Sequence, residues 1–218
     1  IGNYISFSKA VAAATRIVGE ASVKNHSFVH AHGSSTPANR RTESELIDRI
    51  ARTFDLFDWP VTATKSFVGH SLSAASGDQL ISALGTFRYH VIPGIKTIKE
   101  VAPDVFQERA IFPLQDVDVN DRQMHVAFIN SKGFGGNNAT AVVLSPIRLN
   151  SMLRSRHKEK FDRYLLLRER TRCKAEAYSI RADFAELDVI YRFGEPLIDE
   201  KEISFYYTSW KIFFTGRY

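Results

Sequence analysis

Two histidines in short polar motifs are the residues of this chain best suited to chemistry. His32 opens the run His-Gly-Ser-Ser-Thr-Pro, and His70 closes the run Thr-Lys-Ser-Phe-Val-Gly-His. An imidazole can donate a hydrogen bond or carry a proton near neutral pH. No cysteine or serine nucleophile motif accompanies the two histidines. They are therefore a candidate active site that lacks a nucleophile of its own.

Short strands are expected to position both rings. Residues 28–31 form an apolar run directly before His32, and another apolar run precedes His70. We expect each histidine where a strand gives way to a glycine-containing turn, which is a common way to aim a side chain into an active site. Residues 60–64 predict a further strand that ends at Lys65. Lys65 belongs either to the same site or to the ordinary lysines whose stems lie along apolar surface.

Metal binding is a weaker interpretation of the histidines. His30 and His32 would share one face of a strand, as two metal ligands can. No third ligand is evident nearby in the sequence, so we expect no metal.

A later glycine-rich run, residues 133–138, could be a tight turn or a backbone cradle for an anion. It lacks the Lys and Ser/Thr of a phosphate-binding loop.

Alternating helices and strands indicate an α/β layered domain. Residues 11–20 and 42–54 predict helices, the second with an apolar stripe and two acids, Glu43 and Glu45, in its first turn. Small residues after His70 lead into a helix that ends near Phe87 and could pack closely on its neighbours. Strands are expected at 126–129 and 139–144, close enough in sequence to pair as a hairpin.

Length and composition fit one large domain, or one domain with an appendage. The chain has 218 residues, of which 44% are apolar, enough to bury a core. It shows neither a membrane-spanning apolar run nor a signal peptide. It begins at Ile1, so we expect a fragment or a processed product. Cys173 is the single cysteine, which excludes an internal disulfide framework and fits a reducing, cytoplasmic compartment.

Positive charge is concentrated in the C-terminal part, from about residue 149. Between Arg154 and Lys174 nine basic residues stand against three acidic ones. We interpret this stretch as a basic helix with a solvated face, followed by strand-prone segments at 187–193 and 203–207. A docking surface for an acidic partner is the alternative. Nucleic-acid binding is not expected, because no recognition motif accompanies the charge.

The order of the motifs is more specific than any one of them. Residues 12–146 resemble the C-terminal half of the β-ketoacyl-acyl carrier protein synthases, the condensing enzymes of fatty-acid and polyketide synthesis. The resemblance implies an α/β fold of the thiolase-like type, with layered helices around a mixed five-stranded sheet. It also implies two parts: a synthase half at 1–148, and an α+β extension at 149–218.

The resemblance assigns the decarboxylation of malonyl-carrier protein to the two histidines. His32 and His70 match the pair that donates hydrogen bonds to the thioester carbonyl and stabilises the enolate as carbon dioxide leaves. Lys65 matches the lysine that orders the polar network of the site. The acyl chain is taken by a cysteine in the first half of such enzymes, a half that this chain lacks.

Other family positions are also matched. Phe134 corresponds to the gate beside the acyl pocket, and its backbone N–H to part of the oxyanion hole. Ser34 and Thr36 correspond to hydroxyls that bind the phosphopantetheine arm, and Gly135 and Asn138 to further substrate-binding positions. No cofactor is implied, because the substrates are carried on the phosphopantetheine of acyl carrier protein.

Besides Ser34, which keeps the hydroxyl of the usual threonine, two substitutions separate this chain from the usual family pattern. Gln79 stands where a glutamate is usual, which predicts a changed charge network. Lys132 replaces a residue that is often phenylalanine, so a cation lies beside the gate and either alters acyl-chain preference or points to solvent. Together with the charged extension, they suggest a divergent bacterial-type branch.

The leading functional hypothesis is a fragment of a β-ketoacyl-acyl carrier protein synthase, inactive by itself. Its expected partners are acyl carrier protein, the missing N-terminal half and, in the full protein, a second copy in a homodimer. The alternative is a non-catalytic partner subunit of the chain-length-factor type. Such subunits tend to lose catalytic residues, so retention of His32, His70 and Lys65 argues against it.

Overall fold

The computed structural model describes residues 1–34, 36–187, 203–206 and 211–214. The chain divides into two compact units, Ile1–Lys158 and Glu159–Tyr218, each of which is described by itself. The division falls ten residues after the boundary expected between 148 and 149. That boundary remains a prediction of where the synthase-like part ends.

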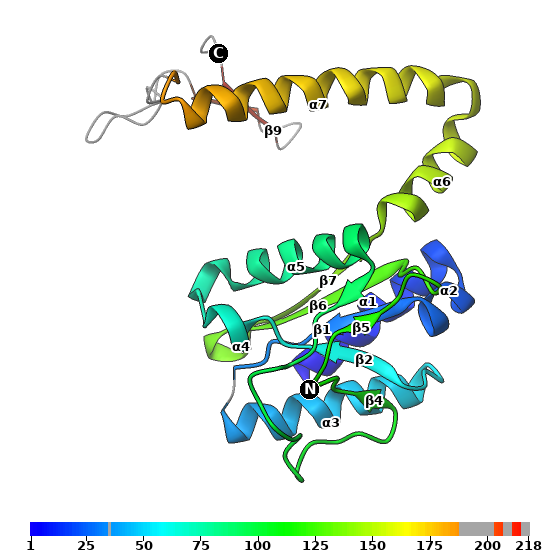
Figure 1. Ribbon diagram of the computed structural model, residues 1–218, viewed down its shortest axis with the longest axis vertical. Coiled ribbons are helices and arrows are strands. Elements are labelled where there is room, and N and C mark those ends of the chain that lie inside the picture. Colours follow the sequence, from blue (N-terminus) through cyan, green and yellow to red (C-terminus); the bar gives the residue numbers. More distant parts are fainter. Residues whose placement is uncertain (35, 188–202, 207–210, 215–218) are drawn as a thin grey trace. The chain divides into compact units, whose positions relative to one another are not determined.

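A five-stranded sheet forms the centre of the first unit, in the order β4-β2-β1-β6-β7 (Figure 1). The strands β1, β2, β4 and β6 run parallel, and β7 pairs antiparallel with β6. The mixed sheet and the hairpin are therefore confirmed. The strands are β1 (Ser27–His30), β2 (Trp59–Thr62), β4 (Ala110–Ile111), β6 (Val126–Lys132) and β7 (Asn138–Leu144).

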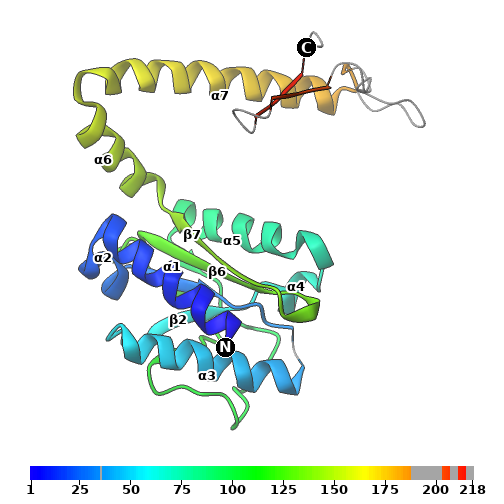
Figure 2. The same ribbon diagram turned by 180° about the vertical axis from the view of Figure 1, so that it is seen from behind.

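Helices cover both faces of this sheet, so the α/β layered class is confirmed (Figures 1 and 2). The helices α1 (Gly2–Val18) and α3 (Pro37–Thr53) pack on one face, and α5 (Ala75–Tyr89) packs on the other. The short helix α2 (Glu20–Asn25) connects α1 to β1. This arrangement follows from strand geometry, since successive side chains of β1 and β6 point to opposite layers.

The core has two parts, one on each face of the sheet. On the α1 and α3 side, the rings of Phe7, Trp59 and Phe128 lie 5.6 to 5.9 Å apart between centroids. On the α5 side, Phe28 meets Phe87 at 5.9 Å in an edge-to-face contact. These contacts suit aromatic rings and fix the two helical layers on the central strands of the sheet.

Two helices begin earlier in the chain than the sequence pattern predicts. The first starts at Gly2 rather than near residue 11, and α3 starts at Pro37 rather than near residue 42. Thr36 caps α3 because its hydroxyl oxygen accepts the backbone N–H of Asn39 at 3.3 Å. Proline at the first helical position supports the same start.

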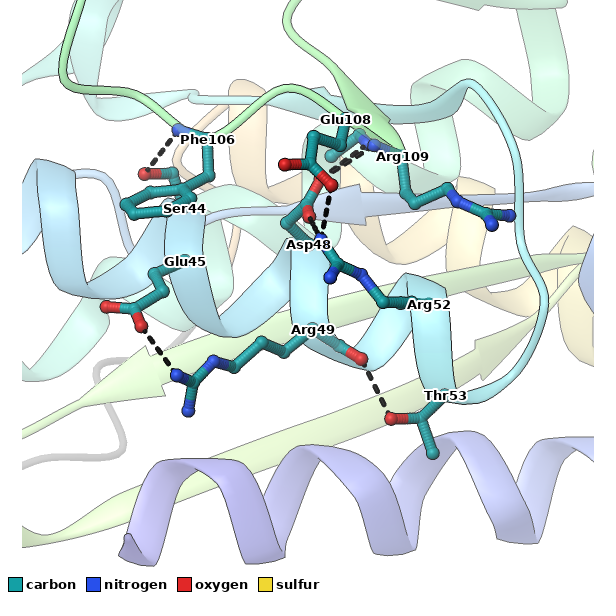
Figure 3. Close-up of polar contacts among 10 residues, drawn as sticks. Ser44, Glu45, Asp48, Arg49, Arg52, Thr53, Phe106, Glu108 and Arg109 are labelled. Carbon is teal, nitrogen blue, oxygen red and sulfur yellow. Dashed lines mark hydrogen bonds and ion pairs between the residues drawn. The ribbon is translucent and has the colours of Figure 1, made fainter.

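Helix α3 is tied to the segment before β4 by side chains of its middle turns (Figure 3). Asp48, which is 1% exposed, accepts the backbone N–H groups of Arg109 and Ala110 at 2.7 and 3.4 Å. Ser44 accepts the N–H of Phe106 at 3.2 Å. These bonds fix α3 against the edge of the sheet.

The remaining elements of the first unit are short. They are α4 (Lys65–Val68), two 3-10 turns at Leu72–Ala74 and Phe134–Gly136, and α6 (Pro146–His157). A small antiparallel ladder joins β3 (Val91–Ile92) to β5 (Val117–Asp118). The expected basic helix is thus two helices, because α6 ends before a 3-10 turn at Lys158–Lys160.

The second unit contains α7 (Phe161–Asp183) and a hairpin of β8 (Ile203–Tyr206) and β9 (Lys211–Phe214). The strand expected at 203–207 is therefore found over 203–206. The strand expected at 187–193 lies outside the described residues apart from Leu187. Among the helices that the structure describes, none is long and apolar enough to cross a membrane.

Candidate active site

The predicted site lies at the carboxyl ends of the parallel strands. His32 follows β1, Lys65 follows β2, and Lys132 closes β6. The strand β1 is flanked by β2 on one side and β6 on the other. The strands that follow β1 in the sequence therefore lie on both sides of it, so β1 marks the point where the strand order reverses. Open α/β sheets bind ligands at such a switch point.

His32 is buried, with 7% of its surface exposed, and its ring is held in one tautomer. Its Nδ1 accepts the backbone N–H of Lys132 at 3.3 Å and faces the Lys65 ammonium at 3.5 Å. An Nδ1 that accepts leaves the proton of the neutral ring on Nε2. The ring therefore presents Nε2–H as a hydrogen-bond donor.

His70 is exposed and lies beside His32. The two ring centroids are 5.4 Å apart, and the planes are nearly perpendicular at 81°. Its Nδ1 accepts the backbone N–H of Leu72 at 3.1 Å, so its neutral ring also carries the proton on Nε2. The expectation that His70 follows a strand is wrong. It follows the helical turn α4 and Gly69, whose φ of 75° lets the chain leave that helix.

Lys65 is a buried part of the site rather than a lysine extended along the surface. Only 8% of it is exposed, and its ammonium donates to the carbonyl oxygen of His32 at 2.5 Å. It begins α4 instead of ending β2, which stops at Thr62. The backbone leaves β1 with Gly33 at a φ of 56°, where a Cβ would lie 3.2 Å from that of Ala63. Glycine there lets the two strand ends approach closely.

The electrostatics keep the buried ring neutral. Burial lowers the pKa of His32, and the nearby positive charges of Lys65 and Lys132 lower it further, while Glu43 raises it. Burial also lowers the pKa of Lys65, against the opposing effect of Glu43 and Asp78. A neutral His32 is the form that donates through Nε2–H without adding charge.

Glu43 is the central residue of the site that the motif analysis missed. It is 3% exposed and accepts four N–H bonds, from the backbone of His32 and Gly33 and from the amides of Asn39 and Asn130. These bonds measure 2.6 to 3.0 Å. A buried carboxylate with this many donors is well compensated. It fixes the backbone that carries His32.

Gln79, found where the family usually carries glutamate, has a clear structural role. Its side chain is 1% exposed, and its Nε2 donates to the carbonyl oxygens of Ala31 at 2.6 Å and Asn130 at 3.4 Å. Both partners are acceptors, so they require a donor that a carboxylate does not have. Gln79 thereby links α5 to the ends of β1 and β6.

The glycine-rich run forms a tight turn between β6 and β7. The N–H of Gly133 donates to Asn137 O at 2.7 Å, and Gly135 and Gly136 have φ values of 74° and 82°. Asn138 donates to Gly136 O at 2.6 Å, which closes the turn. Phe134 lies in this turn, and its side chain is outside the described residues.

Ser34 and Thr36 lie shortly before the start of α3. Ser34 lines a cavity of about 750 Å³ between α3, the end of β2 and the segment after β3. Lys65 and His70 line the same cavity. Thr36 is exposed and is the helix cap, so its oxygen accepts while its O–H is left to donate.

The histidines do not gather into a metal centre. His30 is fully buried within β1, and its Nδ1 lies 3.2 Å from the Thr64 hydroxyl. Burial lowers its pKa to about 3, so it is neutral and packs in the sheet. The described part of the chain holds no group of three or more His, Cys, Asp or Glu placed for a metal ion.

Comparison with known proteins agrees with this geometry. Residues 6–99, which include both histidines and Lys65, match the family described as "Beta-ketoacyl synthase, C-terminal domain". The β-ketoacyl-[acyl-carrier-protein] synthase FabY of Pseudomonas aeruginosa is 57% identical over 203 residues. The chain belongs to the β-ketoacyl-acyl carrier protein synthase family.

The synthase match extends over most of this chain but covers a minor share of the relatives. The alignment with FabY covers 93% of this chain and 32% of FabY. The 3-oxoacyl-[acyl-carrier-protein] synthase 2 of Staphylococcus aureus (strain COL) is 36% identical over 55% of this chain and 27% of that protein. The chain thus spans about a third or less of these relatives.

Solved structures show the same synthase fold. The crystal structure of FabY from P. aeruginosa, described as a noncanonical ketosynthase, matches with a TM-score of 0.83 and 52% identity. That match covers 100% of this chain and 35% of FabY. A type II polyketide ketosynthase bound to acyl carrier protein matches with a TM-score of 0.53 at 21% identity, over 66% of this chain and 34% of that one, and shows the fold alone. The thiolase-like α/β class is therefore confirmed.

Proposed function

We propose that this chain supplies the decarboxylating part of the active site of a β-ketoacyl-acyl carrier protein synthase. The enzyme would join malonyl-carrier protein to an enzyme-bound acyl group by decarboxylative Claisen condensation. The observation that carries the proposal is the pair His32 and His70. Both rings use Nδ1 as an acceptor, and their centroids lie 5.4 Å apart.

The chemistry needs hydrogen-bond donors at the thioester oxygen of the malonyl group. As carbon dioxide leaves, the electron pair of the breaking C–C bond moves into an enolate whose oxygen becomes negative. The Nε2–H groups of His32 and His70 would donate to that oxygen and stabilise it. The enolate carbon then attacks the acyl thioester, and the thiolate of the enzyme's cysteine, outside this chain, is the leaving group.

The remaining predicted residues would hold the substrate. The hydroxyls of Ser34 and Thr36 would bind the phosphopantetheine arm, as the resemblance implies, so no separate cofactor is needed. Phe134 would gate the acyl pocket and contribute its backbone N–H to the oxyanion hole. Gly135 and Asn138 would shape the turn beside the substrate.

The partners follow from the same proposal. Acyl carrier protein would deliver the substrates, and the N-terminal part of the synthase would supply the cysteine and a homodimer interface. The outer side of α5 supports packing against such a part, because Leu80, Ile81 and Leu84 are 38%, 71% and 47% exposed. We place the enzyme in the cytoplasm, where free cysteines such as Cys173 stay reduced.

The experiment that tests the function is His70→Ala in the full-length protein. Decarboxylation of malonyl-carrier protein should fall at least ~100-fold, because one of the two enolate donors is gone. Acyl loading of the cysteine should be retained, as measured by mass spectrometry of the acyl-enzyme. The exposed His157→Ala is the matched control and should change neither step.

Two outcomes would contradict this assignment. Loss of acyl loading in His70→Ala would mean that the ring serves the cysteine rather than the malonyl group. Unchanged decarboxylation would mean that His70 is not a donor to the enolate, and a wild-type enzyme that does not decarboxylate would favour the alternative, a non-catalytic partner subunit. The retained contacts among His32, Lys65 and His70 support the synthase instead.

A further inference from the structure

Lys132 points into the protein framework rather than toward solvent. Its ammonium donates to the Asn39 side-chain oxygen at 2.8 Å, across the gap between β6 and the first turn of α3. Strand geometry accounts for this direction. Every second residue of β6 points to the same face of the sheet. On the α3 side, Val126 and Phe128 pack in the core and Asn130 binds the Glu43 carboxylate. Lys132 is the next residue of this series.

From Asn39 the contacts continue to the backbone of His32. The Asn39 amide donates its Nδ2–H to Glu43 at 2.9 Å. Glu43 in turn accepts the backbone N–H of His32 at 2.7 Å and that of Gly33 at 3.0 Å. An unbroken series of hydrogen bonds therefore joins the Lys132 ammonium to the residue that carries the imidazole.

Residue 132 also holds the ring itself. Its backbone N–H donates to His32 Nδ1 at 3.3 Å, which leaves Nε2–H for a ligand. The imidazole is thus fixed at one end by the main chain of Lys132. The backbone of His32 is fixed at the other end through the Lys132 side chain.

We propose that Lys132 is a positioning residue of the decarboxylation site, which acts on His32 through Asn39 and Glu43. The inference rests on the proposed function. The ammonium selects one orientation of the Asn39 amide, because it binds the oxygen and directs the NH₂ group to the carboxylate. Without it, the amide can turn its oxygen toward Glu43, where two acceptors would oppose each other.

The charge of Lys132 has a second effect, on the protonation of His32. The charged and titratable groups that face this ring are Lys65 of α4, Glu43 of α3, His70 after α4, and Lys132 of β6. Lys65, His70 and Lys132 lower the pKa of His32, and Glu43 raises it. Loss of the Lys132 charge should therefore raise this pKa and protonate the ring at a higher pH.

The test uses the full-length, acyl-loaded enzyme and malonyl-carrier protein over a pH range of about 5 to 9, which brackets the ordinary histidine pKa. In Lys132→Met, kcat for decarboxylation should fall ~10-fold at neutral pH, as for other residues that orient a catalytic ligand. KM for malonyl-carrier protein should stay within about twofold, because no substrate contact is lost. The acid limb of the kcat profile should move to higher pH. Lys132→Arg should keep the wild-type profile.

A double-mutant cycle tests the route through Asn39. If Lys132 acts through that amide, the double variant Lys132→Met with Asn39→Leu should lose no more activity than the more impaired single variant. Additive losses would overturn the route. The exposed Lys99→Met is the matched control, with the same change of side chain and an unchanged profile expected.

The outcomes separate this inference from the proposed function. If the wild-type enzyme decarboxylates malonyl-carrier protein and His70→Ala does not, the function stands. An unchanged kcat in Lys132→Met would then overturn the positioning role of Lys132 alone, and an unshifted acid limb would overturn its effect on the pKa of His32. A wild-type enzyme that fails to decarboxylate would overturn both.

Discussion

At the scale of single residues, the protein determines which nitrogen of each imidazole is left to donate a hydrogen bond. The backbone N–H of Lys132 occupies Nδ1 of His32, and that of Leu72 occupies Nδ1 of His70. Because both donors belong to the main chain, the tautomer is built into the fold rather than into a neighbouring side chain. Two Nε2–H donors result, which is the arrangement an enolate oxygen requires.

Gln79→Glu tests whether the amide at this position is required by the two carbonyl oxygens it binds. The new carboxylate would face Ala31 O and Asn130 O, and the free energy of unfolding should fall by about 2 kcal/mol near neutral pH. Burial would raise the pKa of the introduced carboxyl above its unfolded value, so stability should recover as the pH falls through the folded pKa. Chemical denaturation of the full-length protein at about pH 5 and about pH 8 measures both effects.

The matched control for this change is Gln107→Glu, the same substitution at an exposed position. It should alter the free energy of unfolding by less than about 0.5 kcal/mol at either pH, because its side chain stays in water in both states. Equal stability of Gln79→Glu at both pH values would contradict the donor requirement.

Sequence reasoning found the residues with recognisable motifs and missed those that hold them. His32, Lys65 and His70 stand in runs whose order is specific. The sequence pattern shows Glu43 only as a first-turn acid, although it lies four residues before Ile47 on the buried stripe of α3. A carboxylate on the apolar stripe of a helix was the signal in the sequence that could have identified Glu43. Three of its four bonds come from residues outside α3, so the network itself could not be predicted.

At the scale of elements, the strands were easier to predict than the turns that end them. The apolar runs of β1, β2, β6 and β7 indicate strands, and the structure has them. The segment before His70 is also apolar at Phe67 and Val68, yet it forms the helical turn α4. A run this short has no period to distinguish strand from helix. The backbone N–H groups of this turn donate to the carbonyl oxygens of Ala63 and Thr64, a local pattern that composition does not reveal.

Asp48 provides a prediction about how α3 is fixed to the sheet. Asp48→Ala should lower the free energy of unfolding by about 3 kcal/mol, because it leaves buried N–H groups of Arg109 and Ala110 without their acceptor. Arg49→Ala is the control on the same helix (Figure 3). Its exposed ion pair with Glu45 should contribute less than about 0.5 kcal/mol. Equal losses in thermal unfolding of the full-length protein would contradict the anchoring role of Asp48.

At the scale of the whole molecule, the proposed site is divided between this chain and the rest of the synthase. The single cysteine, Cys173, is exposed on α7, in the second compact unit. The family match covers residues of the first unit alone. The sheet, its helices and both histidines belong to that unit, and the outer side of its α5 is apolar and exposed. These features suit a part that packs against a larger enzyme.

The chain 1–218 alone should therefore show no condensation of acyl- and malonyl-carrier protein, because acyl loading needs the cysteine of the N-terminal part. Co-expression with the remaining part of the synthase should restore turnover if the two parts pack through α5. Ile81→Asp, at a position 71% exposed in this chain, should then reduce the restored activity at least ~10-fold by placing a charge in the apolar contact. The exposed Lys99→Asp is the control and should leave it unchanged. Turnover by the purified chain alone would contradict the division of the site.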